Sequence, residues 1–160
     1  MSGIINYMNR KAFTLLELIV VIIIVGILAT LGLTTYTNQI EYSRTAEAKA
    51  GIGAMRKLAY EYYLKNGTVN GIANADVGVN ATCTSNGYYY FAISDYSTAS
   101  MVGLVARRCE SGGKPPNASS ATVYRIYMFF TPSTGETLWR CNYVDGLGPC
   151  FGYSNNIPPS

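Results

Sequence analysis

A single acidic residue, Glu17, stands at the start of an apolar run that is long enough to cross a bilayer. The run, from Leu18 to Leu33, contains no ionisable side chain. A charged side chain inside a bilayer costs about 2.5–3.5 kcal/mol on insertion scales, so it usually marks a function and a partner of opposite charge. No basic residue follows within the run. We therefore expect the partner to be an α-amino group, created by cutting the chain about one helical turn upstream of Glu17.

The residues before the apolar run predict its orientation. Arg10 and Lys11 precede it, and no acidic residue precedes them. Positive charge on that side keeps the N-terminus in the cytoplasm and places the rest of the chain outside. A secretory signal peptide is cut after its apolar stretch, behind small residues of the A-x-A type. Ala29, Thr30 and Gly32 match that pattern poorly, and the charge order is equally consistent with a cut before the span.

Residues 10–36, with the run KAFTLLE at 11–17, resemble the N-terminal signature of the type IV pilin superfamily. That superfamily includes type IV pilins and the pseudopilins of type II secretion. The resemblance implies that prepilin peptidase, a dedicated membrane enzyme, cuts between Ala12 and Phe13 and then methylates the Phe13 amine. It also implies that Glu17 is the family's membrane glutamate, which acts in assembly.

The chain departs from the family pattern at two places. Gly usually precedes the cut, and we expect Ala12 to slow processing without abolishing it. Pro commonly follows the apolar run, where this chain reads GLTT at residues 32–35. In assembled filaments of the family a segment near here can lose helical structure. Each Gly weakens a helix by about 1 kcal/mol relative to Ala, so Gly26 and Gly32 are candidates for that unwinding, with close packing as the alternative.

Composition restricts the remaining possibilities. The 160 residues hold one membrane helix and one domain of about 90–100 residues. The net charge is +3, but Arg10 and Lys11 lie in the expected leader, so the mature chain is near neutral and shows no strong nucleic-acid signal. The absence of His excludes His-dependent triads and His-containing zinc sites, which argues against an enzyme. Glu136 and Asp145 are too few for a calcium cage, so we expect no metal and no cofactor.

Four cysteines lie on the side expected to be outside the cytoplasm: Cys83, Cys109, Cys141 and Cys150. None forms a C-x-x-C pair, and two disulfides with three possible connectivities are the natural interpretation. We favour Cys83–Cys109 and Cys141–Cys150 because each closes a local loop. A metal site built from all four thiolates is the alternative.

The helix that starts near Phe13 is expected to continue past the bilayer to about Lys65. The first 21 or so residues can span about 30 Å. The rest contains no Pro and carries an apolar stripe at helical spacing, followed by a stop at Asn66-Gly67. The stripe consists of Ile52, Met55, Ala59 and Tyr62. Between residues 36 and 51 the stripe thins, so that stretch either packs on neighbouring subunits or faces solvent.

After a loop through about Asn86, the sequence predicts β-strands separated by turns. The expected strands are Tyr88–Ser94, Met101–Arg107, Thr122–Phe130 and Glu136–Cys141. A sheet of three or four antiparallel strands packed on the amphipathic half-helix gives a pilin-like α+β fold. We expect three parts: a leader at 1–12, a transmembrane and filament-core half-helix at 13–35, and a periplasmic or extracellular globular domain at 36–160.

The resemblance implies a structural subunit that waits in the inner membrane, N-terminus in the cytoplasm, and then enters a pilus for adhesion, twitching motility or DNA uptake. The implied partners are further copies of the chain, prepilin peptidase, the inner membrane and the pilus assembly machinery. A type II secretion pseudopilin, acting in the periplasm, is the first alternative. The Cys141–Cys150 pair and the missing acidic calcium loop favour the pilin. The second alternative is an anchored binding domain that never polymerises. The loops around 67–86, 110–121 and 142–149 show no recognisable binding chemistry.

Overall fold

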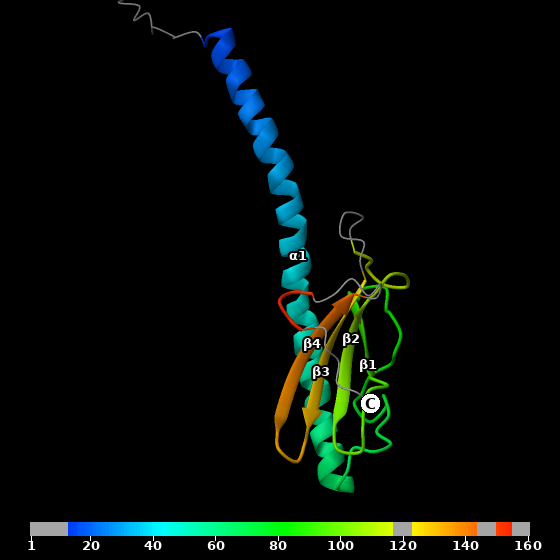
Figure 1. Cartoon of the computed structure of the whole chain (residues 1–160). Coiled ribbons are helices and arrows are strands. Elements are labelled where there is room, and N and C mark those ends of the chain that lie inside the picture. The colour runs from blue at the N-terminus through cyan, green and yellow to red at the C-terminus, as the bar shows by residue number, and fades with distance from the viewer. Residues whose placement is uncertain (1–12, 117–122, 144–149, 155–160) are drawn as a thin grey trace, which may run out of the picture. The chain divides into compact units, whose positions relative to one another are not determined.

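A computed structural model describes residues 13–116, 123–143 and 150–154 of the chain. One helix is followed by four strands (Figure 1). Their bounds are α1 Leu15–Asn66, β1 Tyr89–Ile93, β2 Val102–Arg108, β3 Tyr124–Thr131 and β4 Glu136–Tyr143. This confirms the α+β class, the single long helix and the four strands. The chain divides into two compact units, residues 1–36 and 37–160, and α1 contributes to both.

In the first unit, α1 is apolar on all sides. Its segment Leu15–Gly32 is long and apolar enough to cross a membrane, judged by length and composition, and none of it is buried within the chain. The helix is continuous through Gly26 and Gly32. The proposed unwinding concerns the assembled filament, so it stays a prediction.

The end of α1 follows from one glycine. Gly67 has a φ of +72°, a left-handed conformation that costs little without a Cβ. Its amide donates to the carbonyl of Tyr63 at 2.8 Å, which satisfies one of the last carbonyls of the helix. The side chain of Asn66 also donates, to the carbonyl of Tyr62 at 2.9 Å. The predicted stop at Asn66-Gly67 is confirmed.

The sheet is a meander in the order β1-β2-β3-β4, and every neighbouring pair is antiparallel. Gly135, with a φ of +75°, closes the tight turn between β3 and β4 and donates its amide to the carbonyl of Thr131 at 2.8 Å. The strands differ from the predicted ranges only near their ends.

The predicted apolar stripe of α1 packs in the main hydrophobic core. Ile52 and Ala59 are fully buried, and Met55 is 1% exposed. They share this core with alternate residues of the strands, among them Leu104, Ala106, Ile126, Met128 and Phe130. The opposite face of the sheet carries a smaller cluster of Val105, Tyr127 and Phe129. Alternation along each strand therefore sorts the side chains onto a helix-side face and an outer face.

The stretch 36–51 differs from both predicted alternatives on one of its faces. Glu41, Thr45 and Ala48 are buried against the chain's own domain, with Glu41 only 4% exposed. They extend the stripe of Ile52 toward the N-terminus at helical spacing. The prediction was wrong for this face because the polar residue Glu41 hides the periodicity, and its partner Arg108 is distant in sequence.

Both disulfides join the locally spaced pairs, Cys83 to Cys109 and Cys141 to Cys150. No cysteine is free, which overturns the alternative of a four-thiolate metal site. Across the described residues, no cluster of acidic, His or Cys side chains could hold a metal ion. The loops expected at 110–121 and 142–149 lie partly, and Asp145 wholly, outside the described residues.

Candidate processing and assembly site

The first turn of α1 is a capping box formed by Thr14 and Glu17. The backbone amide and the hydroxyl of Thr14 both donate to Oε2 of Glu17, at 3.0 and 2.9 Å. In return, the amide of Glu17 donates to the Thr14 hydroxyl oxygen at 3.2 Å. This reciprocal pattern satisfies amides that have no carbonyl partner within the helix. Glu17 thus has a local partner that the sequence analysis missed, although the T-x-x-E spacing of residues 14–17 is its signature.

The capping box leaves Glu17 able to accept another partner. Both bonds from Thr14 end on Oε2, and Oε1 accepts no hydrogen bond from the described part of the chain. An ionised carboxylate offers about four lone-pair sites, so the group is oriented but not saturated. The N-terminal end of a helix also favours a negative charge.

Phe13 lies directly before the capping box and is 80% exposed. Ala12 and the rest of the expected leader fall outside the described residues, and so does the expected cut between Ala12 and Phe13. An amine on Phe13 would stand next to the first turn of α1.

The apolar side chains of the first unit are exposed in the single chain. Leu15 and Leu16 are 75% and 73% exposed, and the exposed residues include Leu18, Ile22, Val25, Leu28 and Leu31. A surface this apolar is stable in lipid or against other protein, not in water. The first unit is therefore built to be covered.

A second cluster of charged residues lies inside the globular unit. Arg108 donates from Nε to Oε2 of Glu41 and from Nη2 to Oε1, both at 3.1 Å, which makes a bidentate pair. Arg44 forms a further ion pair with Glu41 from the same helix. The Tyr124 hydroxyl donates to Glu41 at 3.2 Å and lies 2.5 Å from the Tyr89 hydroxyl, which donates to it in turn. This cluster of hydrogen bonds around Glu41 therefore joins α1 to β1, β2 and β3.

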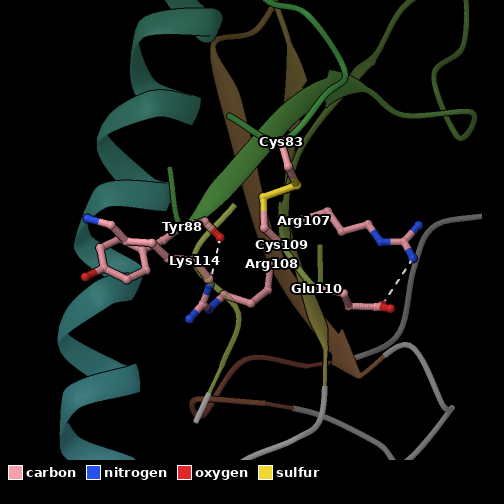
Figure 2. Close-up of a disulfide and its surroundings, with 7 residues drawn as sticks. All are labelled: Cys83, Tyr88, Arg107, Arg108, Cys109, Glu110 and Lys114. Atoms are coloured by element: carbon pink, nitrogen blue, oxygen red, sulfur yellow. Dashed lines mark hydrogen bonds and ion pairs between the residues drawn. A yellow bond between two sulfur atoms is a disulfide. The ribbon is translucent and has the colours of Figure 1, made fainter. Parts of the chain in front are cut away.

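Arg108 also ties the loop after β2 to this cluster. It donates from Nη1 to the carbonyls of Tyr88, at 2.9 Å, and Lys114. Figure 2 shows Arg108 directed toward Tyr88, beside the Cys83–Cys109 disulfide. Nε, Nη1 and Nη2 of this buried arginine therefore each donate a hydrogen bond.

The electrostatics of the cluster stabilise the charged pair. Burial raises the pKa of Glu41, but Arg108 and Arg44 outweigh it and hold that pKa below its ordinary value. Burial lowers the pKa of Arg108, and Glu41 outweighs it and raises that pKa. Burial raises the pKa of Tyr89 to about 12, and it also raises the pKa of Tyr124. The tyrosines are therefore neutral while Glu41 and Arg108 are charged, an arrangement that supports structure and not catalysis.

Comparisons with known proteins agree with the N-terminal sequence signature. Residues 7–33 match the prokaryotic N-terminal methylation motif. The chain is 32% identical to the fimbrial protein EcpC of Eikenella corrodens over 133 residues, 83% of this chain and 82% of that protein.

Two shorter matches agree. The chain is 36% identical to a fimbrial protein of Neisseria meningitidis serogroup B and 35% identical to the type IV major pilin protein PilE of Neisseria gonorrhoeae. Each match covers 80 residues, half of this chain and 46% or 47% of the relative. No solved structure matches the chain. These relatives are named as fimbrial proteins or as a type IV major pilin, and none of the three is named as an enzyme. The chain belongs to the type IV pilin family, as a fimbrial subunit and not an enzyme.

Proposed function

We propose that this chain is made as a precursor, cut between Ala12 and Phe13 by prepilin peptidase, methylated on the Phe13 amine, and polymerised through α1 into a type IV pilus. The observation that carries the proposal is the capped Glu17 at the start of an uncovered apolar helix. In this proposal residues 1–12 are the leader, 13–35 form the membrane span and filament core, and 36–160 are the globular domain.

Before assembly, the precursor waits in the inner membrane with its N-terminus in the cytoplasm. The apolar segment Leu15–Gly32 supports insertion, and Arg10 and Lys11 support the orientation. The assembly machinery then moves the mature chain from lipid into the filament. Lipid is as apolar as these side chains, so close packing between helices has to stabilise the filament core.

Glu17 gives the assembling subunits a specific contact. Its Oε2 is held by its own Thr14, which leaves Oε1 to accept a hydrogen bond from the Phe13 amine of a neighbouring subunit. Pairing the two charges avoids leaving either one buried without a partner, a cost of about 3–5 kcal/mol. A head-to-tail contact of this kind does not close on itself, so it yields an open helical polymer.

Two substitutions separate the charge of Glu17 from its role as a cap. Glu17→Gln removes the charge but can still complete a capping box, whereas Thr14→Ala removes the cap and keeps the charge. We expect E17Q to insert in the membrane and be processed but to form few or no filaments. T14A should assemble, since losing a cap costs only about 1 kcal/mol.

Filaments sheared from cells and counted by electron microscopy, with membrane-bound subunit as the loading control, give the readout. Normal filaments from E17Q would refute the charge pairing, and failure of T14A alone would assign the role to the cap. A deletion strain addresses the pseudopilin alternative. Loss of long surface fibres in the images would indicate a pilin, whereas loss of protein secretion, measured separately, would indicate a pseudopilin. The names of the relatives favour the pilin.

A further inference from the structure

The outer face of the sheet, turned away from α1, carries a cleft of about 610 Å³. Side chains from β1, β2 and β3 line it together with the loop segments around Asn74 and Asp95. Arg107 and Arg125 both contribute. Figure 2 shows why Arg107 reaches this face: it extends away from Arg108, its neighbour on β2, which turns toward Tyr88.

The strand register places two like charges directly opposite each other. Arg107 on β2 pairs with Arg125 on β3, and Tyr90 on β1 pairs with Arg107. Opposite residues have Cβ atoms about 4.5–5.5 Å apart, and like charges at that separation destabilise a sheet. Arg107 has an exposed ion pair with Glu110 at 3.6 Å, a contact of little strength. Within the described ranges, Arg125 has no carboxylate at ion-pair distance.

Arg125 also has an unused donor. Its Nε is buried and, within the described ranges, finds no hydrogen-bond partner, and the same holds for Oδ1 of Asn142, the residue opposite it on β4. The nearby Tyr127 hydroxyl outweighs burial and raises the pKa of Arg125, so the guanidinium is charged. Burying a charged donor without a partner is costly. An oxyanion between the guanidinium groups of Arg107 and Arg125, both of which line the cleft, would relieve the repulsion between them.

The rest of the lining suits a sugar ring. Tyr90 is half-buried and Tyr96 is 39% exposed, so both offer an apolar ring face with a hydroxyl at its tip. The oxygen of Asn74 accepts from the amide of Ile93 at 2.7 Å, which fixes its side-chain amide and leaves the NH₂ to donate. Asp95 supplies an acceptor for hydroxyl groups. Aromatic walls with a few placed polar groups are typical of small-molecule sites.

We propose that this cleft binds an acidic saccharide, with its carboxylate between Arg107 and Arg125 and its ring against Tyr90 and Tyr96. A nucleic acid fits less well, because Asp95 lines the cleft and the chain carries little net positive charge for counterion release. The site belongs to the globular unit and needs no filament, so its failure and the failure of assembly are separate results.

The test uses the full-length mature chain in detergent micelles, titrated with N-acetylneuraminic acid and followed by NMR. Galactose is the neutral control, and oligothymidylate is the nucleic-acid probe. We expect R125Q and R107Q to weaken binding by about tenfold or more, as loss of a charge-assisted hydrogen bond predicts. R56Q is the matched control: it removes an exposed arginine from α1, outside this cleft, and should bind like the unmodified chain.

Thermal unfolding of each variant shows whether it is folded. If R125Q does not fold, the affinity of R107Q tests the proposal. The proposal is overturned if the unmodified chain does not bind the acidic sugar, or if galactose binds equally well. It is also overturned if both arginine variants retain full affinity, or if R56Q loses as much. Tighter, Arg125-dependent binding of oligothymidylate would assign the cleft to nucleic acid instead.

Discussion

Glu17 and Glu41 lie on the same helix and have their charges balanced in different ways. Glu17 accepts from Thr14 at the exposed first turn and keeps one oxygen available. Glu41 is buried and accepts from Arg108 through both oxygens. Removing the first acid should therefore impair assembly, whereas removing the second should impair folding.

We expect Glu41→Gln to lower the free energy of unfolding by about 3–5 kcal/mol, because it leaves the buried guanidinium of Arg108 without its counter-charge. Arg44→Gln is the matched control. Its side chain is 20% exposed and contacts the same carboxylate, and its loss should cost about 1 kcal/mol or less. Urea unfolding of the mature chain, followed by Trp139 fluorescence, measures both. Equal losses in the two variants would contradict the ranking.

The same pair predicts a dependence on pH. The pKa of Glu41 in the folded chain lies below its ordinary value of 4.5, because Arg108 and Arg44 outweigh burial. Its contribution to stability is therefore present above about pH 4.5 and disappears as the pH falls through the folded pKa. When the pH is lowered from about 6 to about 3, we expect the free energy of unfolding to fall more for the unmodified chain than for E41Q. Parallel acid profiles for the two proteins would show that Glu41 is not the titrating group.

At the scale of elements, the contact between α1 and the sheet depends on one missing side chain. A Cβ at Gly51 would lie 2.3 Å from two ring atoms of Phe91, whereas a Cβ at Gly53 would meet no atom within 4 Å. Gly51 therefore lets the edge of β1 approach the helix closely. Gly53 only lowers helix propensity.

This contrast predicts opposite effects for two similar substitutions. Gly53→Ala should raise the free energy of unfolding by about 0.5–1 kcal/mol through helix propensity. Gly51→Ala gains the same propensity but overpacks Phe91, which costs about 1–3 kcal/mol, so the net change should be destabilising. Urea titrations of both variants check the sign. Equal stabilisation by the two alanines would mean that Phe91 can move away at no cost.

Local patterns predicted the elements but not the contacts between them. The helix end at Gly67 and the turn at Gly135 could be predicted from the sequence, because each depends on the backbone conformation of a single glycine. The Glu41–Arg108 pair joins residues far apart in the chain, so no local pattern reveals it. The opposition of Arg107 and Arg125 depends on strand register, which a shift of one residue would abolish. The Thr14–Glu17 capping box is local, and the T-x-x-E spacing of residues 14–17 is its signature, so Glu17 serves both as a helix cap and as the charge at the start of the apolar run.

At the scale of the whole molecule, the two units have different requirements. The globular unit has its own core and two disulfides. The first unit has an uncovered apolar surface and depends on lipid or other subunits. This division predicts that the first unit provides insertion and polymerisation, while the globular unit provides the surface that meets other molecules.

The central claim is that cutting before Phe13 creates the cation that Glu17 needs. Mass spectrometry of the intact mature protein and of its N-terminal peptide measures this directly. We predict a chain that begins at Phe13 and carries one methyl group on its α-amine. A mature chain that retains Arg10 and Lys11, or that begins after the apolar run, would contradict the account.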